Sequence, residues 1–213
     1  IGLTASTFRN ATGWPHPEHR MTARDLSMLA RRTIIDFPEY YHFYAETEFT
    51  HNKVRQTNRN PLLYKNMGVD GLKTGHTEEA GYGLVASAKR GDQRLILVVG
   101  GLDSRKERSL EPQRLLDWGF RTYRNYPLFT AGEEIDVAEV WLGDKGRLPL
   151  LIDRDVKLTL PRSARSSLKA TVIYDNPVPA PVAKGAVVAK LRVTADGMEA
   201  LEIPLVAGED VNR

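Results

Sequence analysis

The strongest constraint on the fold is a predicted β-hairpin in the middle of the chain. Residues 80–89 have the character of one strand, Gly91-Asp92-Gln93 form a turn, and Arg94–Val99 are a continuous apolar run. A continuous apolar run bounded by a turn is typical of a buried strand. The hairpin is therefore expected to lie at the centre of a sheet.

A helix is predicted upstream of this hairpin. Thr22 can cap it, and Asp25 in its first turn is favourable for the helix dipole. Apolar side chains then recur at helical spacing up to Asp36. Pro38 restarts the chain, and a short second helix is expected over residues 40–45.

Another helix is predicted after the hairpin, over residues 104–124. Its side chains available for packing are Leu115, Trp118, Phe120 and Tyr123. Pro112 lies inside the segment, and proline cannot donate the helical hydrogen bond, so a kink or a late start is expected. The first half of the chain is thus predicted to mix helices and strands.

The second half has short strands separated by turns and almost no helical periodicity. Strands are expected near residues 134–142, 147–152, 155–160, 168–174, 186–194 and 199–206. This spacing indicates a small all-β sandwich or barrel. Proline and glycine between Tyr126 and Gly132 mark the boundary, so the expected domains are residues 1–128 and 129–213.

Composition excludes several classes of protein. The 213 residues contain no cysteine, which removes disulfides, thiol catalysis and cysteine metal sites. The 30 basic and 27 acidic residues are interspersed, so no nucleic-acid-binding face is indicated. No apolar run approaches the roughly 20 residues that span a bilayer. The chain starts at Ile1 without a signal-peptide pattern, and we expect this to be a cut end.

Lys73-Thr74-Gly75 is the first candidate for chemistry. In active-site serine enzymes of the penicillin-binding type, such a triplet accompanies a Ser-x-x-Lys and a Ser-x-Asn element. The lysine supplies positive potential, the hydroxyl can bond a carboxylate, and glycine lets a ligand approach the strand backbone closely. Taken alone, the triplet also fits a solvent-exposed turn. The residues around it must therefore decide between a turn and an active-site motif.

Those surroundings match one family in order along the chain. The matching segments are Thr7–Gly13, Thr22–Asp25, Asn58–Asn60, Val69–Thr77, Ala80–Ala88 and Trp118–Phe120. They resemble the low-molecular-mass penicillin-binding proteins, the D-alanyl-D-alanine carboxypeptidases that trim peptidoglycan. The resemblance covers nearly the whole first half. It implies part of an α/β penicillin-binding, β-lactamase-like transpeptidase domain, followed by the small all-β domain that these enzymes carry behind it.

The resemblance also implies roles for individual residues. Lys73 would provide a cationic wall and help proton transfer near the nucleophile, and Thr74 would bond the terminal carboxylate of the substrate. The backbone N–H of His76 would be one oxyanion-hole donor, and Gly75 would keep the strand open for the peptide. Arg108 would face the free carboxylate, because a guanidinium can bond it in two places. The alternative for Arg108 is an arginine on the helix surface.

The nucleophile is expected to lie outside this chain. Ser166 stands three residues before Lys169, but in the β-rich half, where we interpret the spacing as coincidence. The Ser-x-Asn element is also absent from the chain. A serine needs an adjacent base to be activated, so this polypeptide is expected to be inactive without a missing N-terminal part of the same protein.

The remaining candidates favour structural interpretations. His16 and His19 are three residues apart, but Pro17 disfavours the helix that would align them, so no metal or cofactor is predicted. His42 and His51 are expected to be partly buried, and Arg59 to be a structural or rim residue.

The resemblance implies a periplasmic or cell-envelope carboxypeptidase, peripheral to the inner membrane, whose partners are peptidoglycan stem peptides and β-lactams. The chain itself shows no amphipathic membrane anchor. Two alternatives stay open: a class A-like serine β-lactamase, which shares the triplet, and a non-catalytic cell-wall-binding scaffold.

Overall fold

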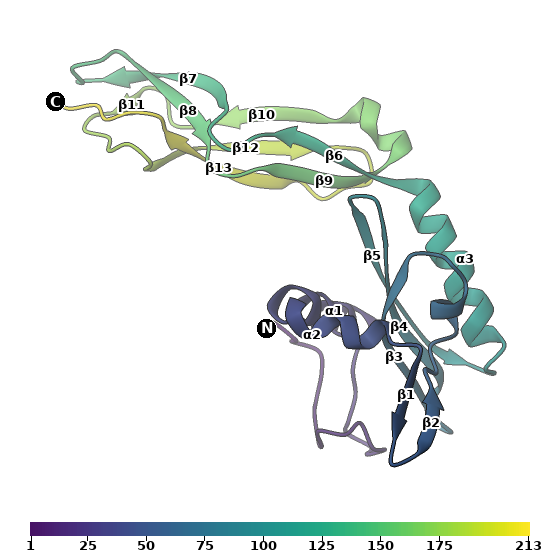
Figure 1. Ribbon diagram of the computed structural model, residues 1–213. Coiled ribbons are helices and arrows are strands. Elements are labelled where there is room, and N and C mark those ends of the chain that lie inside the picture. The colour runs from purple at the N-terminus through teal and green to yellow at the C-terminus, as the bar shows by residue number, and fades with distance from the viewer. The chain divides into compact units, whose positions relative to one another are not determined.

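A computed structural model describes every residue from Ile1 to Arg213. By its internal contacts the chain divides into two compact units, Ile1–Arg121 and Thr122–Arg213. The first unit mixes helices and strands and the second is built from strands, as the sequence predicts (Figure 1). No helix in the chain is long and apolar enough to cross a membrane.

The first unit contains, in chain order, α1 (Ala23–Asp36), α2 (Pro38–Tyr41), the 3-10 helix η1 (His42–Ala45), β1 (Glu48–His51), β2 (Val54–Thr57), the 3-10 helix η2 (Pro61–Tyr64), β3 (Val69–Thr77), β4 (Gly81–Arg90), β5 (Gln93–Leu102) and α3 (Glu107–Thr122).

The predicted hairpin is the pair β4–β5 in a three-stranded antiparallel sheet of order β3-β4-β5. The expectation that the hairpin is central holds only for β4. In this sheet β5 is an edge strand, because β3 pairs on the other side of β4.

Alternate side chains of β4 pack against different helices, as the two-residue period of a strand requires. Leu84 and Ala86 share a core cluster with Leu116 of α3. Val85, between them, packs against the cluster that contains Ala30 of α1. The sheet therefore lies between α3 on one face and α1 on the other, which makes this unit a three-layer α/β structure.

The helices begin at side chains that cap them. At α1, Thr22 Oγ1 accepts a hydrogen bond from the backbone N–H of Asp25 at 3.1 Å. The buried Asp25 carboxylate in turn accepts one from Ser6 Oγ at 2.5 Å, which ties the N-terminal segment to the helix. At α3, Ser104 Oγ accepts from Glu107 N at 3.1 Å, and Ser104 O accepts from Arg108 N at 3.0 Å.

Two expectations about helices need correction, and one hairpin was missed. The helix α3 starts late, as Pro112 suggested, but it ends at Thr122, because Tyr123–Phe129 pairs as strand β6 with a later strand. The predicted helix over residues 40–45 is a four-residue α2 followed by η1. The hairpin β1–β2 was not predicted, because all of its strand residues are exposed and it lacks an apolar alternation.

The second unit contains β6 (Tyr123–Phe129), β7 (Glu134–Trp141), β8 (Arg147–Ile152), β9 (Val156–Pro161), the 3-10 helix η3 (Arg162–Ser167), β10 (Lys169–Ile173), β11 (Val178–Pro179), β12 (Val187–Thr194) and β13 (Leu201–Ala207). All six strands predicted here are present within two residues of their expected ends, while β6 and β11 were missed.

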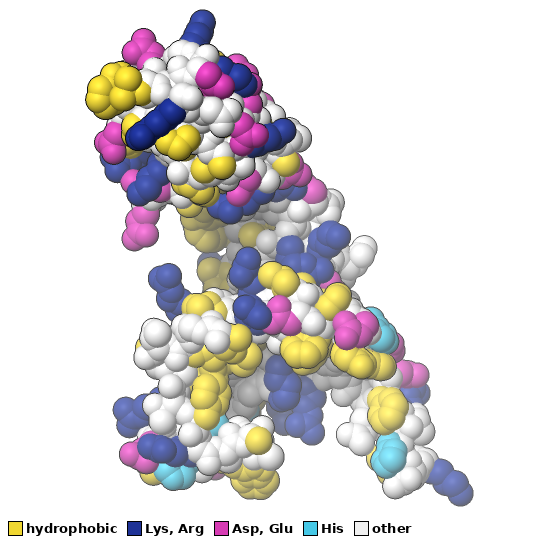
Figure 2. Space-filling model, turned by 90° about the vertical axis from the view of Figure 1, so that its left-hand side faces the viewer, with side chains coloured by type: hydrophobic (Ala, Val, Ile, Leu, Met, Phe, Trp, Pro, Cys, Tyr) yellow, Lys and Arg dark blue, Asp and Glu magenta, His cyan; other side chains and the backbone are white.

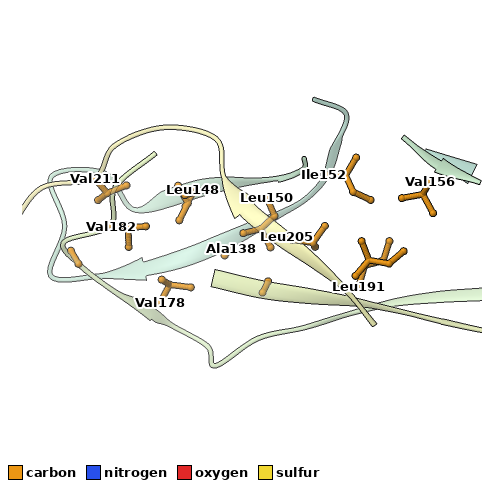
Figure 3. Close-up of a cluster of buried hydrophobic side chains, with 14 of the residues drawn as sticks. Ala138, Leu148, Leu150, Ile152, Val156, Val178, Val182, Leu191, Leu205 and Val211 are labelled. Atoms are coloured by element: carbon orange, nitrogen blue, oxygen red, sulfur yellow. The ribbon is translucent and has the colours of Figure 1, made fainter. Parts of the chain in front are cut away.

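Six of these strands form one sheet of order β10-β12-β13-β8-β7-β11, and β6 pairs with β9. Alternate residues of β8 and β13 are fully buried and belong to one apolar cluster. Figure 3 shows the cluster as hydrocarbon side chains gathered between the strands, including Leu148, Leu150, Leu205 and Val211. This unit has an apolar core of its own.

Candidate functional site

A pocket of about 1200 Å³ lies beside strand β3 in the first unit. Its lining residues come from α1 and the segment before it, η1, the segment at the start of η2, the three strands and the segment around the start of α3. They include four cations and no aspartate or glutamate, the cations being Arg59, Lys73, Arg105 and Arg108. Figure 2 shows Lys and Arg side chains in the hollowed part of this unit. A pocket with this charge favours an anionic ligand.

The predicted triplet lies on this pocket, in strand β3. Thr74 is buried, whereas Lys73 and Gly75 are exposed. The ammonium of Lys73 donates a hydrogen bond to the backbone carbonyl of Thr74 at 2.6 Å. Because β3 is an edge strand, half of its backbone N–H and C=O groups have no partner within the sheet. An extended peptide could therefore pair with this strand.

His76 follows the triplet on the same strand, and its side chain is exposed. Its ring centroid lies 3.9 Å from that of Tyr82, its cross-strand partner on β4. Both residues line the pocket. The imidazole thus contacts an aromatic ring, and its backbone lies on the exposed edge strand.

Arg108 is a buried side chain, with 8% of its surface exposed, so the alternative of a helix-surface arginine is wrong. Its Nη1 donates to the carbonyl of Gly75 at 3.3 Å, and its guanidinium carbon lies 5.2 Å from the Tyr82 ring centroid. Its buried Nε has no hydrogen-bond partner. Burial lowers the pKa of Arg108, and the charge of Arg105 lowers it further. Arg108 is thus a desolvated cation without a counter-ion, beside the triplet.

Arg59 and Arg105 join this cationic group, although the sequence did not single them out for chemistry. Arg105 lies in the turn before α3, three residues before Arg108, and both residues line the pocket. Arg59 precedes Asn60, which is buried and accepts a hydrogen bond from Leu62 N at 3.1 Å at the start of η2. The signal that could have found Arg105 is its helical spacing from Arg108.

Other candidates lie elsewhere. Ser166 lies in η3 and Lys169 in β10, and both are exposed residues of the second unit. His42 and His51 are exposed, which corrects the expectation of partial burial. His51 stacks on the exposed Phe49 of the β1–β2 hairpin. No group of three or more His, Asp or Glu side chains is arranged to hold a metal ion.

The fold and the pocket together define a class of protein. A three-layer α/β unit carries Lys-Thr-Gly on an edge strand beside a cationic pocket, and an all-β unit follows it. This arrangement is that of the penicillin-recognising serine enzymes.

Comparisons with known proteins narrow the class to a family. Residues 1–104 match the family model for D-alanyl-D-alanine carboxypeptidase, and residues 123–213 match the model for the C-terminal domain of penicillin-binding protein 5. The chain belongs to the low-molecular-mass penicillin-binding proteins, the D-alanyl-D-alanine carboxypeptidase family.

Individual relatives agree with this assignment. The chain is 40% identical to the D-alanyl-D-alanine carboxypeptidase DacA of Escherichia coli over 99% of its own length and 53% of the relative's. It is 32% identical to DacF of Bacillus subtilis over 100% of its length and 56% of the relative's. The solved structure of penicillin binding protein 5 from Haemophilus influenzae superposes with a TM-score of 0.89 at 39% identity, covering 100% of this chain and 62% of that one. The chain thus spans about half the length of the curated relatives it matches.

Proposed function

We propose that this chain is the Lys-Thr-Gly-bearing half of a D-alanyl-D-alanine carboxypeptidase that removes the terminal D-alanine from peptidoglycan stem pentapeptides. The observation that carries the proposal is the pocket beside β3. There Lys73, Thr74 and Arg108 lie together, among cations and without a carboxylate side chain. The substrate of such an enzyme ends in a free carboxylate, whose charge this pocket complements.

The reaction would proceed through a serine acyl-enzyme. The serine oxygen attacks the carbonyl of the last peptide bond, that bond breaks, and D-alanine leaves with a proton on its nitrogen. Water then hydrolyses the ester and regenerates the serine. The 213 residues hold no credible Ser-x-x-Lys pair and span about half of the relatives. We therefore assign the serine, its lysine base and the Ser-x-Asn serine to the rest of the whole protein, and expect this polypeptide alone to be inactive.

The residues of β3 would bind and polarise the substrate. The exposed edge of β3 would pair with the peptide backbone, with Gly75 leaving room for it. Lys73 would supply positive charge beside the serine, and the Thr74 hydroxyl would bond the substrate carboxylate. The backbone N–H of His76 would be one of two oxyanion donors, each typically worth about 10²–10³ in rate.

Arg108 would distinguish a chain end from a peptide bond within a chain, because only the end carries a carboxylate. Its support is physical: the side chain is buried beside Gly75, its Nε has no partner, and no carboxylate lines the pocket. A carboxylate bound there would complete the hydrogen bonds of a cation that is already desolvated.

β-Lactams would acylate the same serine. Penicillin-Binding Protein D2 of Listeria monocytogenes, which is 32% identical over 56% of this chain with a TM-score of 0.53, has been solved with ampicillin bound. Together with the family membership, this supports a β-lactam-sensitive enzyme of the periplasm or cell envelope. A place peripheral to the inner membrane is a further part of the proposal for the whole protein.

The test uses the intact protein that carries this chain. Fluorescent penicillin should label it covalently, and it should release D-alanine from a stem pentapeptide ending in D-Ala-D-Ala. Thr74→Val, which removes only the hydroxyl, should lower kcat/KM for the peptide by about 10-fold or more, since a hydrogen bond to a charged group is worth about 1.5–3 kcal/mol. The matched control is Thr171→Val on the exposed strand β10 of the second unit.

Each possible result separates the proposal from its alternatives. A folded intact protein that resists penicillin labelling supports the scaffold alternative and ends the carboxypeptidase proposal. A protein that is labelled but clears the acyl group rapidly is a β-lactamase. Slow deacylation together with D-alanine release is the expected result.

A further inference from the structure

A cluster of polar side chains lies at the start of strand β3, and none of them lines the pocket. Its centre is the carboxylate of Asp70, three residues before Lys73. Tyr41 donates its hydroxyl to Asp70 Oδ1 at 2.9 Å, and Arg94 donates Nη1 to Oδ1 at 2.8 Å and Nη2 to Oδ2 at 2.7 Å. Two parallel hydrogen bonds from a guanidinium to a carboxylate fix the geometry of both groups.

The cluster joins four elements of the first unit. Tyr41 is the last residue of α2, and Asp70 and Arg94 are the second residues of β3 and β5. Arg94 Nη1 also donates to Ser87 Oγ at 2.6 Å, in the central strand β4, where Ser87 is fully buried. The guanidinium carbon of Arg94 lies 5.4 Å from the Tyr41 ring centroid. Asp70 is therefore held directly by Tyr41 of α2 and by Arg94 of β5, and Arg94 is in turn held by Ser87 of β4.

Asp70 occupies an irregular position in the sheet. Val69 pairs with Ala88, but Gly71 pairs with Ser87, so two steps along β3 correspond to one step along β4. Asp70 is thus the extra residue of a β-bulge. A bulged residue has no cross-strand partner of its own, and the cluster supplies it with partners through its side chain.

The residue after the bulge is held just as closely. The Asn60 side-chain amide, which is 1% exposed, donates to the carbonyl of Gly71 at 2.9 Å. A Cβ added to Gly71 would lie 2.6 Å from the Tyr41 hydroxyl oxygen, which is closer than real Cβ contacts allow. Only glycine lets Tyr41 reach Asp70 across this position.

The bulge sets how the rest of β3 faces the sheet. Beyond it the register is regular, with Lys73 opposite Val85 and Thr74 opposite Leu84. Side chains alternate between the faces of a strand, so a shift of one residue would exchange the faces to which Lys73 and Thr74 point. The position of the bulge therefore decides which side chain of the triplet reaches each side.

We propose that Asp70, clamped by Arg94 and Tyr41, is a positioning residue for the active site, which locks the bulge and thereby holds Lys73 and Thr74 in register. This inference rests on the proposed function for its kinetic consequence. Burial raises the pKa of Tyr41 to about 12, which favours the protonated hydroxyl that donates to Asp70.

The test compares two identical substitutions in the intact protein. Asp70→Asn removes the charge that faces Arg94. The control, Asp117→Asn, removes the charge that faces Arg90, whose Nη2 donates to Asp117 Oδ1 at 3.0 Å and whose guanidinium carbon lies 4.3 Å from the Phe120 ring centroid. Both changes break an arginine–carboxylate contact with an aromatic ring beside it, but Asp117 lies on α3 and is not a member of the Asp70 cluster.

Two measurements separate positioning from general stability. Fluorescent penicillin titrates the active sites, so the acylation rate constant is obtained per folded site. Hydrogen exchange reports the protection of the β3 amides independently of activity. Asp70→Asn should acylate about 10- to 100-fold more slowly per site, since a displacement of about 1 Å can have an effect of this size, and should exchange faster in β3. Asp117→Asn should match the wild type in both measurements.

Milder variants keep the test decisive if Asp70→Asn does not fold. Tyr41→Phe removes one of the three hydrogen bonds to the carboxylate and should slow acylation less than Asp70→Asn. Asp70→Glu restores the charge and should give an intermediate rate. Wild-type rates and β3 exchange in Asp70→Asn or Tyr41→Phe, or equal losses in Asp117→Asn, would overturn the positioning role alone. A wild-type protein that penicillin does not acylate would instead overturn the proposed function, and this inference with it.

Discussion

Replacing Arg108 by methionine should separate substrate selection from folding. Methionine fills much of the same space but removes the guanidinium. Arg108 is a buried cation without a counter-ion, its pKa is lowered by burial, and its hydrogen bond to Gly75 O is long at 3.3 Å. Replacing a desolvated charge with an apolar side chain is often neutral or stabilising. We therefore expect the free energy of unfolding to change by no more than about 1 kcal/mol.

The effect on peptide cleavage should be much larger. A hydrogen bond to a charged group is worth about 1.5–3 kcal/mol, and an arginine fork can make two with one carboxylate. Allowing for incomplete additivity, the loss should be about 2–4 kcal/mol, or roughly a 30- to 900-fold fall in kcat/KM for the pentapeptide. Acylation by penicillin should fall less, because the strained lactam ring contributes reactivity that does not depend on Arg108.

The assays are D-alanine release, fluorescent penicillin labelling and thermal unfolding of the intact protein. Arg114→Met is the matched control, since Arg114 is exposed on the same helix and pairs only with Glu111 in the structure. Equal losses toward peptide and penicillin would refute selection of the carboxylate by Arg108. A loss of several kcal/mol in stability would refute the account of an unpaired buried cation.

Two further predictions concern stability. Because the pKa of Tyr41 is raised from about 10 to about 12 in the fold, its protonated form contributes stability that is complete below pH 10 and is lost as the pH rises toward 12. Tyr41→Phe should abolish this part of the alkaline loss, at most about 2 kcal/mol, in urea titrations repeated between pH 9 and 12; the same slope in both proteins would contradict it. In the second unit, Leu205→Ala should lower the free energy of unfolding by about 3 kcal/mol, because Leu205 is fully buried in the β core. Val187→Ala, at a position 64% exposed, should change it by less than about 0.5 kcal/mol, and similar losses in both variants by circular dichroism would contradict this packing.

Local sequence patterns predicted a helix or strand correctly wherever that segment itself contains the cap, the apolar spacing or the turn that defines it. The cap at Thr22 and the apolar spacing after it predicted α1, and a run of apolar residues after a turn predicted β5. Turn residues between short apolar segments predicted six strands of the second unit. They failed for β6, because Tyr123–Phe129 has no clear alternation and is a strand only through its pairing with β9.

The residues of the candidate site also fall into two groups: those identified from the sequence and those found only in the structure. Lys73-Thr74-Gly75 is visible in the sequence because its three members are adjacent, and the family resemblance gave Arg108. Arg59 was interpreted as a structural or rim residue and Arg105 was given no role, because nothing in their neighbours marks either arginine for chemistry. Only the tertiary structure brings Arg59, which precedes η2, and Arg105, which precedes α3, to the pocket that contains Lys73.

By itself, the sequence predicted the helices α1 and α3, the hairpin β4–β5, six strands of the second unit, the division into an α/β half and an all-β half, and the Lys73-Thr74-Gly75 triplet. These depend on residues within a few positions of one another, whose periodicity and turn chemistry can be followed along the chain. The tertiary structure decided the bulge at Asp70, the burial of Arg108 without a counter-ion, and the absence of carboxylates from the pocket. Each of these depends on side chains that are distant in sequence, as when Arg94 and Tyr41 meet on Asp70, and no local pattern encodes such a meeting.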